Sequence, residues 1–544
     1  MLSRRAFVGS SSLALATPLL NPRAPAGQGP DFDLGAQTHF SHGWLLPWMD
    51  RARSLGARTL RDGLAWSTVE TRPGRFAFDP YRVDFLDKAR RDGVRLLLCI
   101  DPRHPGYDNG DTAFSPAAQQ AFAAFLRALL DRYGDVITAV EVGNEINGER
   151  GMTGEAARHR PEAHVGLLTA IQRQVKPAHA HVAILGGSTN VIGVGFLERI
   201  FAAGGLEVMD GVAVHPYRSF AETVDVELTL LNDAMNRHGR PVPVYATEFG
   251  DQFDRPEDAP DLMLKMTAML GASGVSRAFW YALSDEAHFR NMGLFTQRQA
   301  LKPAGETFAW LQRRLLAGGR PERIVTDDLS HAYRFGRAGV VLWGVSRPLK
   351  ISGQMGAFDS RGRPIALPDL LAETPVVLLG DVEVEMGPAA TVADSFHQFS
   401  KAPWSYMAQT PDGQVHPLGW MRWDWTSYIG DRRFRPLAFN ALTLAPAGAG
   451  DRGTKAILRY TAKAAGRFTY SAAVTHAGTG DGVDVAIAIN ERITEPAAVV
   501  KRDWSFERTL DVRAGDAIDL RIGPNATSGG DNVRYRAVVR SLTA

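Results

Sequence analysis

Short apolar segments separated by longer amphipathic stretches recur along the chain up to about residue 316, and this alternation constrains the fold most strongly. The short segments have the length of β-strands, and some intervening stretches have helical periodicity and begin near a proline, which suits a first helical turn. Eight such units favour a closed, parallel (β/α)8 barrel. The predicted strands are residues 32–38, 57–61, 95–100, 137–143, 182–186, 211–214, 242–247 and 277–281, and helices are predicted at 116–133 and 161–175.

The chain has 544 residues, more than one hydrophobic core usually fills, so further domains are expected after the barrel. Beyond residue 316, short alternating strands are broken by Gly, Pro, Asp and Asn, as is typical of antiparallel sheets. We predict the barrel over 28–318, a small β-sandwich accessory domain over 319–390 and a jelly-roll-like β-sandwich over 391–544. The predicted fold class is α/β, a TIM barrel followed by C-terminal β-sandwich domains.

The first 27 residues have the pattern of a targeting signal. Arg4 and Arg5 precede a mildly apolar, Ser-rich stretch, which resembles a twin-arginine export signal. Such a signal predicts a periplasmic or secreted protein; the alternative is a basic terminus leading into a short disordered tail. No later apolar run reaches about 18 residues, so no membrane span is expected.

Charge and motif content narrow the function classes. The chain carries 61 basic and 59 acidic side chains, a formal net charge of +2, so nucleic acid is not an expected partner. Its single cysteine, Cys99, cannot form an intrachain disulfide and lies in an apolar segment, where we expect it in the core. The metal-protease, paired-cysteine, EF-hand and complete phosphate-loop motifs are all absent from the sequence, so neither a metal nor a cofactor is expected.

Two glutamates follow predicted strands of the barrel. Asn144 and Glu145 lie at the end of the fourth strand, and Glu248 lies at the end of the seventh. Carboxyl ends of barrel strands hold the active sites of such folds, and two carboxyls about 5 to 5.5 Å apart can break a glycosidic bond with retention. Either glutamate alone would be read as a solvated loop residue, but the pair with Asn144 predicts a glycosidase.

The segments 141–145 (Glu-Val-Gly-Asn-Glu) and 246–250 (Ala-Thr-Glu-Phe-Gly) resemble the two signature strands of glycoside hydrolase clan A, and among its families the chain is most similar to family 39. The likeness extends over residues 31–316. It implies a retaining mechanism, with Glu145 as the general acid/base and Glu248 as the nucleophile. The chain departs from this pattern at Gly143, where the clan commonly has Trp, and at Ile146, where it often has Pro.

Several other residues are candidates for binding the substrate or for orienting the carboxyls. Arg61, at the end of the second strand, is predicted to pair with Glu248, or alternatively to form an ordinary salt bridge. The resemblance implies that His215 and Tyr217 hydrogen-bond the nucleophile and the sugar. Asn144 is expected to donate to the sugar 2-hydroxyl.

Aromatic and imidazole side chains at other strand ends are further candidates. The resemblance favours Trp280 as an apolar floor for the sugar ring, although an aromatic in a barrel strand is more often core. His39 and His104 follow the first and third strands and could bind hydroxyls, or could be ordinary loop residues. In the last domain, residues 420–425 contain three tryptophans, which form either a sugar-stacking platform on a strand or part of the sandwich core.

The sequence therefore predicts a retaining glycoside hydrolase that cleaves β-linked bonds in a polysaccharide or oligosaccharide by double displacement. Bacterial exopolysaccharide is one candidate substrate. The alternative from another class is a noncatalytic carbohydrate-binding protein on a hydrolase scaffold.

Overall fold

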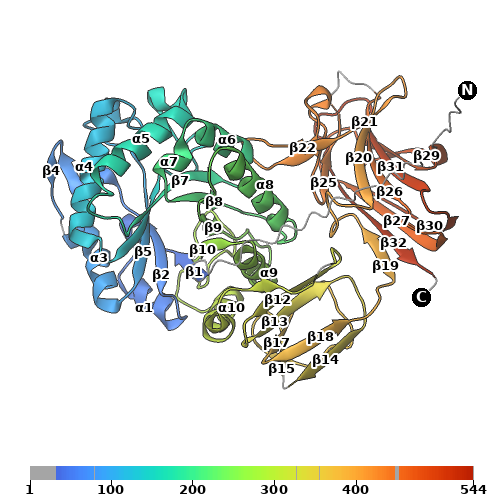
Figure 1. Ribbon diagram of the computed structural model, residues 1–544, viewed down its shortest axis with the longest axis horizontal. Coiled ribbons are helices and arrows are strands. Elements are labelled where there is room, and N and C mark those ends of the chain that lie inside the picture. Colours follow the sequence, from blue (N-terminus) through green and yellow to red (C-terminus); the bar gives the residue numbers. More distant parts are fainter. Residues whose placement is uncertain (1–31, 79, 326, 354–355, 448–452, 543–544) are drawn as a thin grey trace, which may run out of the picture. The chain divides into compact units, whose positions relative to one another are not determined.

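Eight parallel strands close into a barrel in the order β1-β10-β9-β8-β7-β6-β5-β2 (Figure 1). The computed structural model describes residues 32–78, 80–325, 327–353, 356–447 and 453–542, so the predicted export signal lies outside the described residues. The barrel strands are β1 (Asp33–Gln37), β2 (Thr59–Gly63), β5 (Arg95–Ile100), β6 (Ile137–Val142), β7 (Ala183–Asn190), β8 (Gly211–His215), β9 (Val244–Phe249) and β10 (Val275–Trp280). Each of the eight predicted segments overlaps one of these strands, and the predicted fold class is confirmed.

Helices outside the barrel cover its strands (Figure 1). In α4, Ser115 caps the first turn by accepting a hydrogen bond from the Ala118 amide at 3.2 Å, and Pro116 occupies a first-turn position that needs no donor. Phe122, Leu126 and Leu129 recur at helical spacing and are fully buried. The helices are α1 (Pro47–Ser54), α2 (Trp66–Val69), α3 (Pro80–Asp92), α4 (Pro116–Tyr133), α5 (Arg160–Gln174), α6 (Val194–Ala202), α7 (Gly205–Val208), α8 (Val224–Arg237), α9 (Ala259–Ala272) and α10 (Pro303–Trp310).

The barrel interior contains an apolar layer below a polar one. Six side chains from consecutive strands of the closed sheet form a separate buried cluster. Because strand side chains alternate between the two faces, the residue two positions further along each strand also points inward, nearer the carboxyl end. In β6, β8 and β9 these positions hold Glu141, His215 and Thr247, all fully buried. The apolar cluster consists of Leu97, Ala139, Leu185, Ala213, Tyr245 and Phe279.

Antiparallel strands follow the barrel and form a small accessory unit. A six-stranded sheet packs against the barrel through Tyr333 and Trp343, which belong to the same buried cluster as the barrel helices, and Trp343 Nε1 donates to Glu222 at 2.8 Å. Its other face contributes to a second, smaller core. The six-stranded sheet contains β11 (Glu322–Arg323), β12 (Ser330–Phe335), β13 (Gly339–Gly344), β15 (Gly356–Phe358), β16 (Pro364–Ile365) and β17 (Val376–Leu379). A separate two-stranded sheet consists of β14 (Leu349–Gly353) and β18 (Val382–Met386).

The last region is an antiparallel β-sandwich of an eight-stranded and a six-stranded sheet around their own core. The first sheet contains β19 (Thr391–Asp394), β22 (Gly419–Met421), β23 (Tyr428–Gly430), β24 (Ala438–Phe439), β25 (Thr443–Ala445), β27 (Gly466–His476), β30 (Asp503–Val512) and β32 (Val533–Ser541). The second contains β20 (Trp404–Gln409), β21 (Val415–Pro417), β26 (Lys455–Thr461), β28 (Val483–Ile489), β29 (Arg492–Val500) and β31 (Ala517–Pro524). Among the described helices, none has both the length and the apolar character needed to cross a bilayer.

Candidate active site

Arg61 from β2 lies at the centre of the polar layer and is almost completely buried. Its Nε donates to Glu141 at 2.8 Å, and its Nη1 donates to Glu248 at 2.5 Å and to Gln37 at 2.6 Å. Burial alone lowers the pKa of Arg61, but the charges of Glu141 and Glu248 outweigh it and raise that pKa well above its ordinary value. A permanently charged guanidinium therefore contacts Glu248 directly.

Glu248, at the end of β9, is held at both carboxyl oxygens. Arg61 occupies one oxygen, and the Tyr217 hydroxyl donates to the other at 2.6 Å. Burial and the charge of Glu248 raise the pKa of Tyr217 well above its ordinary value, so this hydroxyl remains a donor. The Glu248 side chain is only 10% exposed. These contacts hold both oxygens of the Glu248 carboxyl and so fix its orientation.

Glu145 lies in the turn after β6 and is the more open of the two carboxyls, with 33% of its side chain exposed. Its backbone φ of 48° is in the left-handed region, and so is that of Gly143 at 81°. Gly143 thus adopts a conformation that glycine reaches without steric cost. Asn190, the last residue of β7, donates to the Glu145 carboxyl at 2.7 Å.

His215 lies between the two carboxyls. Its Nδ1 is 3.4 Å from Glu145 Oε1 and 3.6 Å from Glu248 Oε2, and its Nε2 is 3.2 Å from Glu141 Oε1. One oxygen of each catalytic carboxyl and one ring nitrogen of His215 all lie within 4.8 Å of one another. The structure therefore brings the two predicted catalytic glutamates together around His215.

The protonation pattern of this cluster differs from the simplest expectation for an acid/base. Burial alone would lower the pKa of His215, but the charge of Glu248 and the hydrogen bonds to Glu141 and Glu145 raise it to about 9. Burial raises the pKa of Glu145, but hydrogen bonds from His215 and Asn190 outweigh it, so the net pKa lies below its ordinary value. The proton near neutral pH is therefore on His215, hydrogen-bonded to Glu145, rather than on Glu145 itself.

Glu141 is the fully buried counter-ion of this cluster. Burial raises its pKa, but the charge of Arg61 and the hydrogen bond from His215 outweigh it and bring the pKa to about 2. Ser188 and Thr247 also donate to its Oε1, at 2.7 and 2.9 Å. Glu141 thus orients both the Arg61 guanidinium and the His215 ring without facing the gap between the catalytic carboxyls.

Asn144 and Cys99 border the same centre. The Asn144 side-chain oxygen accepts from Arg61 Nη2 at 3.1 Å, which leaves its amide group as a donor. Cys99 was expected in the core, but it is only half-buried, and its sulfur lies 3.4 Å from the Gly143 carbonyl oxygen. The reason is that Cys99 is two residues beyond the inward-facing Leu97 and so belongs to the polar layer.

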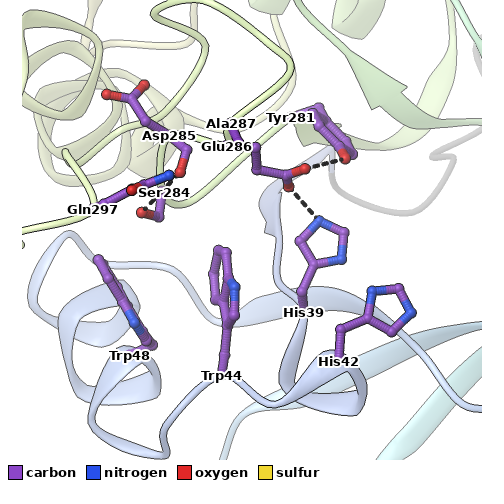
Figure 2. Close-up of a pocket in the computed structure, with 10 residues that line it drawn as sticks. All are labelled: His39, His42, Trp44, Trp48, Tyr281, Ser284, Asp285, Glu286, Ala287 and Gln297. Carbon is purple, nitrogen blue, oxygen red and sulfur yellow. Dashed lines mark hydrogen bonds and ion pairs between the residues drawn. The ribbon is translucent and has the colours of Figure 1, made fainter.

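A hollow of about 510 Å³ opens beside the catalytic centre, on the side of β1 and β10 (Figure 2). His39 Nε2 lies 2.6 Å from Glu286, and the Tyr281 hydroxyl donates to the same carboxylate at 3.1 Å. Tyr281 also packs edge-on against Tyr217, at 6.2 Å between ring centres, which connects the hollow to Glu248. Trp44 and other aromatic and polar side chains complete the lining. His39 therefore lies where the sequence predicted a hydroxyl-binding residue.

Two predicted substrate-binding residues do not reach the site. Trp280 is fully buried, packs against Phe249 and Phe253, and donates its Nε1 hydrogen to the Met292 carbonyl at 2.7 Å. Because Phe279 points into the barrel, Trp280 must point outward, and Tyr281 takes the inward position. The expected sugar-binding floor is therefore not Trp280.

His104 is the second correction. It is 4% exposed, and both ring nitrogens are occupied, by the Glu70 carbonyl at 2.6 Å and by the Gly106 amide at 2.9 Å. Its ring packs against Trp66 and Tyr107. His104 therefore holds the loop after β5 to the segment after β2 and has no nitrogen free for a hydroxyl.

Sequence reasoning missed Glu141, Ser188 and Asn190 as site residues. A charged residue between Val140 and Val142 in an apolar strand was a usable signal, because a buried carboxylate needs partners. Asn190 was missed because the fifth predicted strand ended at Gly186, whereas β7 continues to Asn190 past a register shift.

The acidic cluster is poorly suited to a metal ion, although Glu145, His215 and Glu248 converge. Both ring nitrogens of His215 already contact carboxylate oxygens, Nδ1 those of Glu145 and Glu248 and Nε2 that of Glu141. The Arg61 guanidinium also occupies one oxygen of Glu248.

Comparisons with known proteins support the fold. No family model matches the sequence, and no curated protein matches it. Among solved structures, a family 39 glycoside hydrolase from the gut symbiont Bacteroides cellulosilyticus WH2 is similar, with a TM-score of 0.52 and 16% identity over 64% of this chain and 80% of that one. A family 39 β-xylosidase from Caulobacter crescentus has a TM-score of 0.44 and 17% identity, over 66% of this chain and 96% of that one. At such identities the likeness shows a shared fold.

Proposed function

We propose that this chain is a retaining glycoside hydrolase that cleaves β-linked bonds in a polysaccharide or oligosaccharide, with bacterial exopolysaccharide as a candidate substrate. The observation that carries the proposal is the pair Glu145 and Glu248, whose carboxyl oxygens approach within 4.8 Å across an open gap. Retaining enzymes hold their carboxyls about 5 to 5.5 Å apart, whereas inverting enzymes need about 6.5 to 9.5 Å to admit a water. The spacing therefore supports retention.

In the first step, a Glu248 oxygen attacks the anomeric carbon, and the bond from that carbon to the leaving oxygen breaks. Glu145 protonates the leaving oxygen, and the proton comes from His215 through the 3.4 Å contact between Nδ1 and Oε1. Esterification removes the charge of Glu248. Because that charge is the largest factor raising the pKa of His215, its loss lowers that pKa and favours release of the proton.

In the second step, Glu145 takes a proton from a water molecule, whose oxygen attacks the anomeric carbon, and passes this proton back to His215 through the same contact. The ester bond to Glu248 breaks, and the carboxylate returns to its contacts with Arg61 and Tyr217. The amide group of Asn144 is positioned to donate to a sugar hydroxyl, a contact expected to tighten in the oxocarbenium-like transition state.

Hydrolysis assays on a panel of β-linked glycans test this proposal. We expect Glu248→Gln to lower kcat by about 10⁴-fold or more while glycan binding is retained, because the variant keeps the shape and loses the nucleophile. A wild-type protein that binds a glycan and cleaves none of the panel would instead support the noncatalytic carbohydrate-binding protein.

We also propose export through the twin-arginine-type signal in residues 1–27, to the periplasm or the medium. Cell fractionation compares the full chain with a variant carrying Arg4→Lys and Arg5→Lys. Retention of the variant in the cytoplasm supports the proposal, and identical distributions of the two chains contradict it.

A further inference from the structure

The segment between β22 and β23 of the C-terminal sandwich reaches the catalytic side of the barrel. The Trp423 carbonyl accepts from the Gly195 amide at 2.9 Å, and the Asp424 carboxylate pairs with Arg199 through two contacts of 2.7 and 2.8 Å. On the neighbouring loop after β8, Phe220 packs against Phe396 of the sandwich. The sandwich therefore lies over the loops that follow β7 and β8.

Two glycines at the start of α6 permit this close approach, Gly193 at its N-cap and Gly195 in its first turn. A Cβ atom on Gly193 would lie 2.4 Å from the Asp424 carbonyl oxygen, and one on Gly195 would lie 2.8 Å from the Arg422 carbonyl oxygen. Neither distance can be accommodated without moving the backbone of the segment. The fit between the barrel and residues 422–425 is thus built into the sequence of both partners.

Hydrogen bonds also link this contact between the barrel and the sandwich to Glu145, the proposed acid/base. The Asn147 side chain donates to the Asp424 carbonyl at 2.8 Å and to the Asn190 carbonyl at 3.1 Å, and its oxygen accepts from the Asn190 amide at 2.9 Å. Asn190 in turn donates to Glu145. One buried amide therefore fixes both the sandwich segment and the residue that holds the proton donor.

Through these contacts Trp425 comes to lie beside the turn that carries Glu145. Its ring edge would lie 3.7 Å from a Cβ on Gly148, whose amide donates to the Glu145 carbonyl oxygen at 2.8 Å. The side chain is 37% exposed, which is high for a tryptophan at a contact between two domains. The sequence had placed Trp423 and Trp425 on one face of a strand, but β22 ends at Met421 and both lie in the following loop.

We infer that Trp425 is a sugar-stacking residue of the leaving-group side of the cleft, and that the C-terminal sandwich completes the active site there. This inference rests on the proposed glycosidase function. The acid/base protonates the leaving oxygen, so the sugar attached to that oxygen lies on the Glu145 side. A partly exposed indole beside the turn that carries Glu145 suits the C–H surface of that ring. The hollow beside Tyr281 lies on the opposite side, at the ends of β1 and β10.

The test compares substrates that differ only in the leaving group. β-Glycosyl fluorides of xylose, glucose, galactose and mannose place no ring on the leaving-group side, whereas the matching 1,4-linked disaccharides do. We expect Trp425→Ala to lower the ratio of kcat/KM for the disaccharide to kcat/KM for the fluoride about tenfold, and Trp425→Phe to lower it less. A ratio within about twofold of wild type in Trp425→Ala would overturn the inference.

A second variant tests the role of the docked segment without touching the indole. Gly193→Ala must displace residues 422–425, and we expect the same selective loss. Gly419→Ala is the matched control in the same domain, because nothing lies within 4 Å of its added Cβ. A wild-type protein that hydrolyses neither class of substrate overturns the proposed function and this inference together. Normal fluoride hydrolysis with an unchanged ratio in both variants overturns the inference alone.

Discussion

The two catalytic carboxyls are held by regions of different character. Glu248 is 10% exposed and is fixed by Arg61 and Tyr217, so its environment is made entirely of barrel residues. Glu145 is 33% exposed and is held by Asn190, which is linked through Asn147 to the C-terminal sandwich. The proposed nucleophile therefore has a fixed electrostatic environment, whereas the proposed proton donor lies where the barrel and the C-terminal sandwich meet.

This difference fits the chemistry of a double displacement. A nucleophile must stay charged and aligned for every substrate, which favours burial against a permanent cation. A proton donor must serve leaving groups of different size, so its surroundings determine which groups fit. We expect substitutions on the Glu248 side to affect all substrates alike, and those on the Glu145 side to depend on the leaving group.

Among the variants that test this comparison, Glu145→Ala is expected to show the largest effect. We expect kcat/KM to fall about 10³-fold for substrates with a sugar leaving group, because protonation by a positioned acid is lost. For dinitrophenyl glycosides, whose leaving group needs no proton, the fall in kcat/KM should be about tenfold or less. Steady-state kinetics on the two classes measure the difference, and equal losses would show that Glu145 is not the acid.

His215 contacts both Glu145 and Glu248. Its ionisation should make the free energy of unfolding depend on pH, which gives a second test of the comparison. Its pKa in the folded chain, about 9, exceeds the ordinary value of 6.5, so its stabilising contribution is fully present below about pH 6.5 and is lost as the pH rises through 9. We expect His215→Gln to cost about 3 kcal/mol near pH 6 and much less near pH 10. Melting temperatures of both chains across this range measure it, and a pH-independent difference would contradict the raised pKa.

A matched pair of hydrogen-bond deletions should give the smallest effects. Tyr217→Phe removes one donor from Glu248, and Asn190→Ala removes one from Glu145. We expect kcat/KM to fall about 10- to 100-fold in Tyr217→Phe for all leaving groups, because the partner is a buried charge. In Asn190→Ala we expect a fall of about threefold to tenfold that is larger for sugar leaving groups. The reverse order of the two effects would contradict the comparison.

The barrel could be predicted from the sequence, and the proposed catalytic pair could be selected from it, because both depend on local patterns. Eight apolar segments of strand length define the closed sheet, Glu248 lies at the end of β9, and Glu145 lies in the turn after β6. Trp280 was predicted to bind the sugar ring, but the inward-facing position belongs to the next residue, Tyr281. A shift of one residue along a strand exchanges the inner and outer faces. Phe279 occupies the inner face, which the local sequence of three consecutive aromatics does not reveal.

Contacts between distant segments were beyond the reach of sequence patterns. His104 is engaged by the Glu70 carbonyl, and Asn147 by Asp424, 277 residues further along the chain. Such pairs follow from tertiary packing, which neither propensity nor periodicity encodes. The same limit concealed the position of Trp425 beside the turn that carries Glu145.

Covalent trapping tests the central claim most directly. The wild-type protein is incubated with 2-deoxy-2-fluoro-β-glycosyl fluorides of several configurations, and the labelled peptide is identified by mass spectrometry. The account predicts one added fluoroglycosyl group per chain, attached to Glu248, with loss of activity in step with labelling. A label on Glu145 or on any other side chain, or hydrolysis of the parent sugar with inverted configuration, would contradict it.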